Sequence, residues 1–338
     1  MDDQGYTVLA GRYNVYNHVI GRGQAGTVHP AIDTQTGERV AVKVINRVYT
    51  EADAARREAL RREITVSMRL QHVNIIALKD VQVSELHVCL VLELATGGEL
   101  FSRVAKQGRM AEDEARGYFS QVVAAVDYCH AQQVCHRDLK LENILLSEQG
   151  SGGIKITDFG FSKDFQNDSL PKTKRVGTLA YMAPEVAMEG ARDASGKEQS
   201  YDGKRADIWA CGVILFVLVA GSYPFGDEAR EKPVAIYRRI IEAQYSLPQD
   251  LSAECQGLLQ RILVVDPQQR ATLSEIKAHP WFVEQFEQPA APPAVPEFQW
   301  ESVIPQGAEA AAAAPAVAAA PVGLADDGGL DADEDRLW

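Results

Sequence analysis

His136-Arg-Asp-Leu-Lys-Leu-Glu-Asn143 is the most specific segment of the sequence. It combines carboxylate, cationic and amide side chains at fixed offsets, an order that an ordinary polar loop has no reason to contain. Asp158-Phe-Gly160 lies fifteen residues after Asn143, and an apolar segment precedes it. Ala183-Pro-Glu185 lies 25 residues after Asp158. Three motifs in this order and at these spacings are far more specific than any one of them alone.

A glycine-rich segment, Gly21-Arg-Gly-Gln-Ala-Gly26-Thr-Val28, precedes these motifs. The pattern alone is a weak signal, because it occurs in dinucleotide-binding turns and in plain glycine-rich hairpins. A dinucleotide-binding turn opens directly into a helix, whereas strand-type residues follow here. Glycines between two strands can bring backbone N–H groups close to phosphates, because no Cβ blocks the approach. The segment therefore indicates a loop that covers phosphates.

Lys43 lies on the next strand, between Val42 and Val44. A lone lysine on a strand is usually a solvated edge residue, but these neighbours indicate a buried strand. A buried ammonium group needs an acidic partner. The helix that follows offers Glu58 and Glu63, of which Glu63 is the favoured partner.

The sequence pattern changes from strand-like to helical near Glu93–Gly98. Before this point, segments rich in valine and isoleucine predict strands, and after it, helical periodicity dominates. The predicted strands are Asn14–Ile20, Val28–Ile32, Arg39–Ile45, Ala77–Val83 and His87–Leu92. The predicted helices are Glu51–Leu70, Glu112–His130, Ala206–Ala220, Ser252–Leu263 and Leu273–Ala278. We therefore expect an α+β protein with a β-rich N-terminal part.

Charge is distributed unevenly over the 338 residues, whose net charge is −13. From Val283 onward there are eleven acidic residues and one basic residue, which leaves a net of −3 for residues 1–282. This nearly balanced part shows no sign of the basic patch that is typical of nucleic-acid binding. Residues 283–338 are rich in alanine and proline and then acidic, so they cannot bury enough apolar surface to fold alone. We expect a disordered tail there.

The five cysteines are odd in number and form no C-x-x-C pair. This argues against a zinc site, a thioredoxin motif and a disulfide framework. The N-terminus shows no basic and apolar leader, and the longest apolar run, Ala210–Gly221, is shorter than the ~20 residues of a membrane span. We expect a monomer in the cytoplasm, the nucleus or both, without a membrane or nucleic-acid partner.

Together, the motifs resemble the signature of eukaryotic protein kinases over roughly Tyr13–Phe282. The resemblance implies the two-lobed protein-kinase fold, with a small β-rich N-lobe over residues 13–94, a larger helical C-lobe over 95–282 and the tail over 283–338. It also implies that Arg270 pairs with Glu185. Lys140 in the catalytic loop is typical of the serine/threonine branch. Further matches are Tyr201–Lys204, Asp207–Trp209, Gly212 and Asp266–Arg270.

A closer similarity is to the plant sucrose-non-fermenting-related kinases of subfamily two, which are osmotic-stress and abscisic-acid kinases. It rests on Tyr128–Asn143, Gly97–Phe101 and Pro171–Thr173, and on the acidic C-terminus. The similarity implies a role in stress or nutrient signalling, in a plant or a green alga.

The resemblance implies that the chain transfers the γ-phosphate of ATP to serine or threonine of protein substrates. Asp138 would orient the substrate hydroxyl and accept its proton. Lys140 would stabilise charge at the γ-phosphate, assisted by Thr178. Asn143 and Asp158 would hold two magnesium ions, which prefer oxygen ligands.

The resemblance also implies where ATP lies. Lys43, held by Glu63, would bind the α- and β-phosphates. Backbone groups of Glu93–Ala95 would bind the adenine edge, with Leu92 behind it. For the apolar contacts, a plain core role is nearly as good an explanation. The implied ATP-binding residues are Ile20, Gly21, Arg22, Gly23, Gln24, Ala25, Gly26, Thr27, Val28, Ala41, Lys43, Glu93, Ala95, Glu99, Leu145 and Asp158.

Regulation and specificity are implied by a second set of charged residues. Arg137 is a cation that needs an anion, and in the family a phosphorylated activation loop supplies it. Thr173 is the favoured phosphosite and Ser169 the second choice, which implies an upstream kinase and a phosphatase as partners. Glu99 and Glu142, near the expected substrate groove, favour arginine before the phosphoacceptor. For Glu99 the alternative is ribose binding alone.

Some positions depart from the family pattern, although none removes a catalytic group. Glu297–Ile304 is too short to be the regulatory helix that the subfamily carries after its kinase domain. The other departures are Ala25 at the glycine-loop tip, Pro30 in a strand, Leu179 in place of a proline and an insertion within Ala187–Ser200.

Two other functions were weighed against an active kinase. One is a pseudokinase scaffold that binds nucleotide and partners without turnover, although pseudokinases often lack a catalytic residue and none is missing here. The other is a dinucleotide-binding oxidoreductase, which rests on the glycine segment alone and leaves the catalytic-loop motif unexplained.

Overall fold

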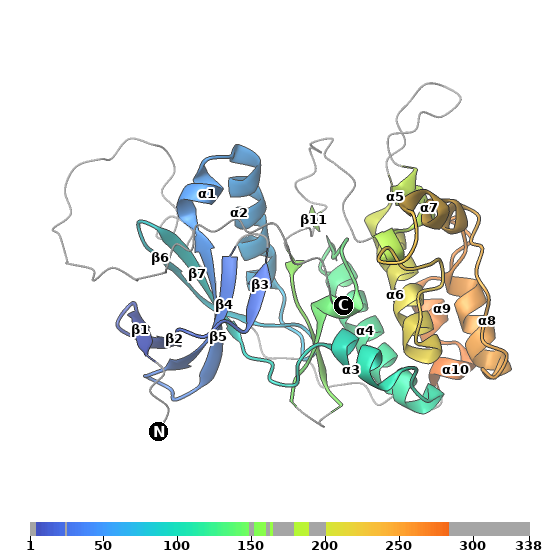
Figure 1. Cartoon of the computed structure of the whole chain (residues 1–338), viewed down its shortest axis with the longest axis horizontal. Helices are drawn as coiled ribbons and strands as arrows, with labels where there is room; N and C mark the ends of the chain where they lie inside the picture. Colours follow the sequence, from blue (N-terminus) through green and yellow to red (C-terminus); the bar gives the residue numbers. More distant parts are fainter. Residues whose placement is uncertain are drawn as a thin grey trace.

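The computed structural model describes residues 5–23, 26–148, 152–159, 163–164, 179–188 and 201–283. It consists of an antiparallel β-sheet with helices beside it and a larger group of helices (Figure 1). The segment after strand β7 (His87–Glu93) joins the two parts. The predicted α+β class, with a β-rich N-lobe and a helical C-lobe, is confirmed.

Among the described residues, the N-lobe forms a seven-stranded sheet in the order β1-β2-β4-β5-β7-β6, with β3 paired to β4. All of its neighbouring strands are antiparallel. Strand β5 is central, because it pairs with β4 on one side and β7 on the other. The strands are β1 Tyr6–Leu9, β2 Tyr13–Tyr16, β3 Gly21–Gly23, β4 Gly26–Asp33, β5 Arg39–Asn46, β6 Leu78–Val83 and β7 His87–Glu93.

Strand β5 is buried on both faces, which is why its sequence is an almost continuous apolar run. Val42 packs with Val91 and other residues on one face of the sheet. Ile45 packs with Ile64 of the neighbouring helix on the opposite face. Because side chains alternate along a strand, Lys43 points to the same face as Ile45, toward that helix.

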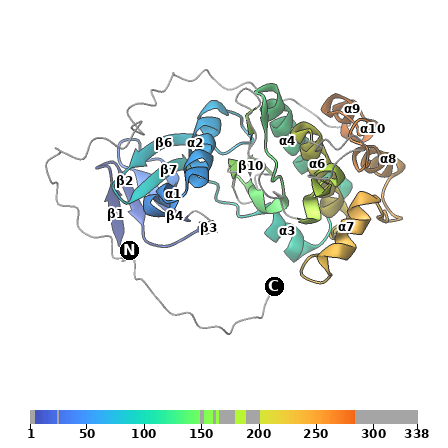
Figure 2. The same ribbon diagram turned by 90° about the horizontal axis from the view of Figure 1, so that it is seen from above.

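The predicted helix Glu51–Leu70 is confirmed as α2 (Ala54–Arg69) but begins later than predicted, because a separate short helix, α1 (Arg47–Glu51), precedes it. Asp53 adopts an extended conformation between them, and its side chain accepts a hydrogen bond from the backbone N–H of Ala55. This is an N-cap, a position that aspartate favours. Helix α2 buries Ile64 and Val66 and lies between the sheet and the C-lobe helices (Figure 2).

Helix α6 (Gly203–Ala220) forms the centre of the C-lobe and is apolar on nearly all sides. A helix of this kind is buried in a core, and α6 packs against α4 and α8. It begins at the N-cap Asp202 and ends at Gly221, which has the positive φ of 70° that favours glycine at a helix C-terminus. The other helices are α3 Leu100–Gln107, α4 Glu112–Ala131, α5 Pro184–Ala187, α7 Pro233–Ile241, α8 Ala253–Ile262, α9 Leu273–Lys277 and α10 Pro280–Val283.

Short strands and 3₁₀ turns of the C-lobe place the sequence motifs at the junction with the N-lobe. Strand β9 pairs with β10, and β8 pairs with β11. These elements are β8 Val134–Cys135, η1 Leu141–Asn143, β9 Ile144–Leu146, β10 Ile154–Ile156, β11 Lys163–Asp164 and η4 Leu179–Tyr181.

The sequence prediction missed β1, α3 and α7, and also the short elements α1, α5, α10, β8, β9, β10 and β11. The predicted strand Asn14–Ile20 is also wrong in extent, because β2 ends at Tyr16 and β3 begins at Gly21. The predicted tail over 283–338, apart from Val283, and most of the insertion within 187–200 lie outside the described residues.

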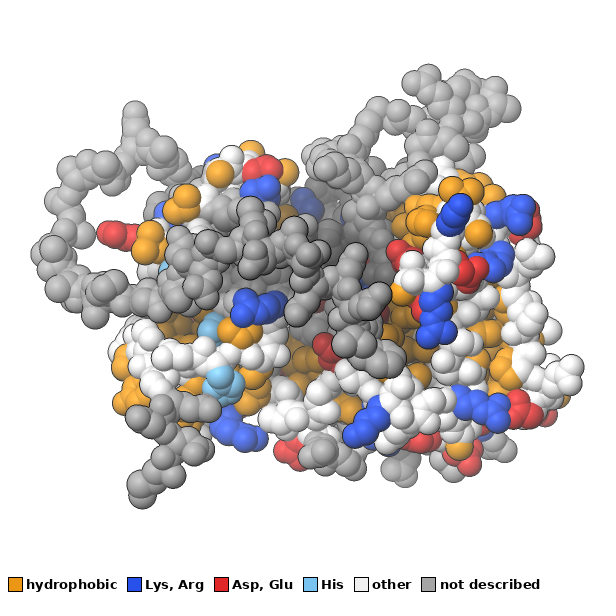
Figure 3. Space-filling model, viewed as in Figure 1, with side chains coloured by type: hydrophobic (Ala, Val, Ile, Leu, Met, Phe, Trp, Pro, Cys, Tyr) orange, Lys and Arg blue, Asp and Glu red, His pale blue; other side chains and the backbone are white. Residues whose placement is uncertain are grey.

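The surface carries charges of both signs. On the face in Figure 3, Lys and Arg side chains are interspersed with Asp and Glu over the C-lobe helices. Within the described part of the chain, no helix has the length and the apolar character that crossing a membrane requires.

Candidate active site

Lys43 and Glu63 form an ion pair between the sheet and helix α2. The Nζ–Oε1 distance is 2.6 Å, and both side chains are about 85% buried, with 15% and 14% exposure. Asp158 lies further away, with its Oδ1 3.9 Å from the same Nζ. Burial alone would lower the pKa of Lys43, but the two carboxylates outweigh it and raise that pKa. The lysine therefore stays charged, and its partner is Glu63 rather than Glu58.

The catalytic loop brings Asp138, Lys140 and Asn143 together. Lys140 Nζ lies 2.9 Å from Asp138 Oδ2. The side-chain amide of Asn143 donates to the backbone carbonyl of Asp138 over 2.8 Å. Because the side-chain nitrogen of Asn143 makes this bond, its side-chain oxygen remains available to another partner. Asp138 and Asn143 are both buried.

Asp207 of helix α6 binds the backbone of the catalytic loop. Its carboxylate accepts the backbone N–H groups of His136 over 2.9 Å and of Arg137 over 2.8 Å, and it lies 2.9 Å from Nε2 of His130. Burial alone would raise the pKa of Asp207, but these hydrogen bonds and the histidine charges lower it. Asp207 therefore fixes the backbone directly before Asp138, where Arg137 has a positive φ of 68°.

Asp158 follows strand β10 and also has a positive φ, of 66°. The segment before it is held by backbone bonds, because Ile156 N–H donates to Asn74 and Thr157 N–H donates to Asn143. The carboxylate of Asp158 is 47% exposed and points to the region of Lys43. The structure thus places Asp158 beside Lys43, directly after a residue whose backbone is bonded to Asn143.

The glycine segment forms the β3–β4 hairpin above these residues, with Gly21 opposite Val28 in the register. A Cβ at Gly26 would lie 1.8 Å from the backbone oxygen of Val44, so only glycine fits there. Ala41 of β5 is buried, whereas Ile20 is 49% exposed. Of the predicted ATP-binding residues, Gln24 and Ala25 lie outside the described residues. Arg22, Gly23 and Thr27 lie on the two strands of the hairpin.

The connection between the lobes starts at Glu93 and runs to α3. The Glu93 side chain forms an ion pair with Lys155 of β10 at 2.5 Å, which the sequence did not predict. Glu99 is the N-cap residue of α3 and bridges to Leu145 through the backbone, so the connection packs onto the strand after the catalytic loop.

The model of the protein kinase domain family matches residues 14–282 of this chain. The chain belongs to the protein kinase family. It is 44% identical over 270 residues to the serine/threonine-protein kinase SAPK4 of Oryza sativa, which covers 79% of this chain and 71% of the relative. It is 46% identical to SAPK1 of Oryza sativa over 279 residues, covering 81% and 77%, and 43% identical to SRK2E of Arabidopsis thaliana over 270 residues, covering 79% and 70%. The chain is therefore a protein serine/threonine kinase, and its predicted similarity to the plant subfamily-two kinases is confirmed.

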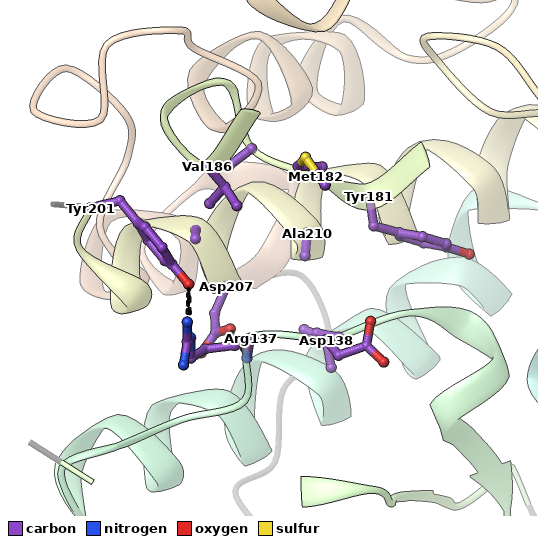
Figure 4. Close-up of a pocket in the computed structure, with 11 residues that line it drawn as sticks. Arg137, Asp138, Tyr181, Met182, Val186, Tyr201, Asp207 and Ala210 are labelled. Carbon is purple, nitrogen blue, oxygen red and sulfur yellow. Dashed lines mark hydrogen bonds between the residues drawn. The ribbon is translucent and has the colours of Figure 1, made fainter. Parts of the chain in front are cut away.

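Arg137 of this kinase was expected to need an anion, but among the described residues its guanidinium meets a neutral group. Its Nε donates to the hydroxyl of Tyr201 over 2.8 Å, and the charge lies 5.5 Å from the centre of that ring. Figure 4 shows this contact in a pocket between the catalytic loop and helix α6. Thr173, Ser169 and Thr178, the expected loop residues, lie outside the described residues.

Glu185 and Arg270 form the ion pair that the kinase resemblance implied. The guanidinium binds both carboxylate oxygens, over 2.7 and 2.9 Å, and Arg270 is fully buried at 0% exposure. The remaining donors of Arg270 bind backbone carbonyls, and its charge stacks over Trp209. This pair ties the start of α5 to the loop after α8.

Glu142 of the kinase is partly buried in the catalytic loop. One of its carboxylate oxygens is buried and has no hydrogen-bond partner among the described residues. Burial raises the pKa of Glu142, despite the opposing charge of Lys140. Tyr181 lies against it and makes an edge-on ring contact with Tyr223, at a centroid distance of 5.6 Å. Glu99, by contrast, is exposed and accepts a hydrogen bond from Ser102.

The donor chemistry at the lobe junction fits magnesium. Asn143 offers an amide oxygen and Asp158 a carboxylate, and magnesium prefers such oxygen ligands. The protein kinase domain implies the use of ATP and magnesium in general.

Proposed function

We propose that this serine/threonine kinase transfers the γ-phosphate of ATP to protein hydroxyls that follow an arginine, in stress or nutrient signalling. The geometry around Asp138, Asn143 and Asp158 carries the catalytic part of the proposal. The buried carboxylate oxygen of Glu142 carries the preference for arginine. The kinship with plant relatives supports the signalling role.

The chemical step needs positioning and charge neutralisation more than covalent help. Lys43 is held by Glu63 in one orientation, so its ammonium group can bind the α- and β-phosphates without first being ordered. Asp138 accepts a hydrogen bond from the substrate hydroxyl and takes its proton as the oxygen attacks. Lys140, next to it, stabilises the negative charge at the γ-phosphate.

Asn143 and Asp158 would hold magnesium, which when bound neutralises phosphate charge and fixes the phosphate oxygens. The contribution of the chain itself is to orient the ligands. Asn143 is oriented by its bond to the Asp138 carbonyl. Asp158 is oriented by the backbone bonds of β10 and by its own positive φ.

The glycine hairpin would cover the phosphates, and the segment from Glu93 to Ala95 would bind the adenine edge. Ala41 and Leu145, from the two lobes, would lie on either side of the base. Leu92, at the end of β7, would lie behind it. Activation by an upstream kinase at Thr173, with reversal by a phosphatase, completes the proposal, in the cytoplasm or the nucleus.

The preference for arginine follows from the chemistry of Glu142. A buried acceptor without a partner is costly, so it favours a donor from the substrate. Arginine offers a charged, forked set of donors that matches a carboxylate. The partly exposed ring of Tyr223 nearby can take the guanidinium by cation–π attraction.

A positional-scanning peptide array tests this proposal. With labelled ATP and magnesium, we expect strong selection for arginine at one position before the phosphoacceptor. Glu142→Gln should weaken that selection by about tenfold, the value of one charge-assisted hydrogen bond of ~1.4 kcal/mol. Glu254→Gln, on the exposed side of α8, is the matched control. An array without selection for arginine or lysine would refute the specificity but leave the kinase activity standing.

No observation favours the pseudokinase alternative. The side chains that turnover requires, among the described residues, lie together with ordered partners. A wild-type protein phosphorylated at Thr173, which mass spectrometry can establish, and still inert toward all peptides would reverse this judgement.

A further inference from the structure

A part-buried ion pair connects the two lobes at the back of the site. Lys155 Nζ of strand β10 lies 2.5 Å from Glu93 Oε1 at the end of β7. The exposed fractions of the two side chains are 14% and 28%. Sixty-two residues separate them in the sequence, and neither side chain carries a role in the transfer described above.

Glu93 is held by a second bond as well. Its other carboxylate oxygen accepts the backbone N–H of Ala77 over 3.3 Å. In addition, the backbone N–H of Glu93 donates to the carbonyl of Ala77 over 2.9 Å. The residue at which the sheet ends is thus fixed from three directions, of which Lys155 supplies the only charged contact among the described residues.

Strand β10 is joined to the N-lobe at a second place. Ile76 N–H donates to the carbonyl of Ile156 over 2.9 Å, and Ile156 N–H donates to the carbonyl of Asn74 over 2.8 Å. The backbone directly after Lys155 is therefore already positioned by neutral bonds. What the lysine adds is a contact from this fixed strand to the first residue of the connecting segment.

We propose that Lys155 is a positioning residue for adenine, which acts by holding Glu93 and so fixes the backbone of the segment Glu93–Ala95. The inference rests on the proposed function in one respect, namely that this segment binds the adenine edge. Lys155 holds the carboxylate of Glu93, and the backbone that follows Glu93 contacts the base.

The physical basis is the low exposure of the pair. Exposed ion pairs contribute little, because water and salt screen them and because two long side chains must be ordered. Here the strand orders the lysine and Ala77 orders the glutamate, so little entropy opposes the contact. Without the lysine, the partly buried carboxylate of Glu93 would lack a cationic partner. Turning this carboxylate toward water would rotate the backbone that follows.

Titration of the full-length protein with adenosine tests the inference, because adenosine lacks the phosphates that Lys43 binds. Isothermal calorimetry would compare the wild type with Lys155→Met, Glu93→Gln and the double variant. Lys277→Met is the matched control, because it breaks an ion pair of 2.8 Å with Asp127 in the C-lobe, far from the connecting segment.

We expect Lys155→Met to bind adenosine about tenfold more weakly, and Glu93→Gln to show a similar loss. The double variant should be no worse than either single one, because both changes remove one contact. The control should bind like the wild type. In steady-state kinetics, Lys155→Met should raise KM for ATP and leave kcat within about twofold, a split that general loosening of the fold would not produce.

Two results would overturn the inference. One is wild-type adenosine affinity in Lys155→Met. The other is a loss in the double variant equal to the sum of the single losses. Glu93→Gln keeps an oxygen for the Ala77 N–H, so it keeps the test decisive if the lysine variant is unstable. A wild type that does not bind adenosine would instead refute the adenine site of the proposed function itself.

Discussion

Replacing Asp207 by asparagine is the sharpest perturbation of the catalytic loop that leaves its chemical groups in place. The Asp207 side chain is 2% exposed and accepts the backbone N–H groups of His136 and Arg137, one on each oxygen. Asparagine has the same shape but only one acceptor oxygen. One of the two N–H groups must then face the amide NH₂, as donor against donor.

The expected cost follows from these two bonds. A buried donor left without an acceptor costs about 1–3 kcal/mol, and a hydrogen bond to a charged group is worth about 1.5–3 kcal/mol. We expect Asp207→Asn to lower the free energy of unfolding by about 3 kcal/mol. Because the lost bond precedes Asp138 directly, kcat should fall by up to about 100-fold, the cost of a misplacement near 1 Å.

Urea unfolding at neutral pH and kinetics with a peptide substrate provide the assay. Asp127→Asn serves as control, because Asp127 is 45% exposed and its ion pair with Lys277 should contribute only about 0–1 kcal/mol. A stability and a kcat for Asp207→Asn that match those of the control would refute the reasoning. The contribution of Asp207 to the free energy of unfolding depends on pH. Since the pKa of Asp207 is lowered on folding, its contribution is present above the unfolded value near ~4 and is lost as the pH falls through the folded value.

Three further predictions concern other parts of the molecule. Glu185→Gln leaves the buried charge of Arg270 without its carboxylate and should cost about 3–5 kcal/mol of unfolding free energy in chemical denaturation; a loss below 1 kcal/mol would contradict the role given to this pair. Gly26→Ala places a methyl group against the Val44 carbonyl, so we expect the hairpin to shift and KM for ATP to rise at least tenfold, which nucleotide titration would check. Burial, aided by a nearby lysine charge, lowers the pKa of His72 below 6.5. An NMR titration of the His72 ring should show this lowered pKa. The free energy of unfolding should fall as the pH drops below the ordinary histidine value of about 6.5, because the unfolded chain binds the proton more readily than the folded protein does.

The chemistry of the site could be predicted because its signal lies within short segments. The position of Lys43 on a buried strand predicted an acidic partner, for which the next helix offered Glu58 and the favoured Glu63. The pairing of Glu185 with Arg270 came from the family resemblance. In each case the charged residue had to find a partner, and few candidates were available.

Other contacts could not be predicted, because nothing in the local sequence marks them. Lys155 and Glu93 meet only because β10 docks against the N-lobe, and neither stands in a recognisable pattern. The contact of Arg137 with the hydroxyl of Tyr201 arises in the same way. Such pairs are determined by how distant elements pack.

The predicted boundaries of helices and strands were wrong where a single polar residue marked the true boundary. Asp53 sits in a highly charged run, so its action as an N-cap was hidden by the helical composition around it. The hairpin of β1 and β2 did leave a signal. Ala10 and Gly11 both have positive φ, of 51° and 66°, and a glycine between two short strands is consistent with such a turn, although alanine disfavours this conformation.

The central claim is that this chain transfers phosphate with the groups assembled around Asp138, Asn143 and Asp158. The most direct test is the magnesium-dependent transfer of γ-phosphate from ATP to an arginine-containing serine peptide, with Asp158→Ala measured alongside. We predict phosphopeptide from the wild type, none without magnesium and none from the variant. Equal transfer by Asp158→Ala and the wild type would contradict the claim.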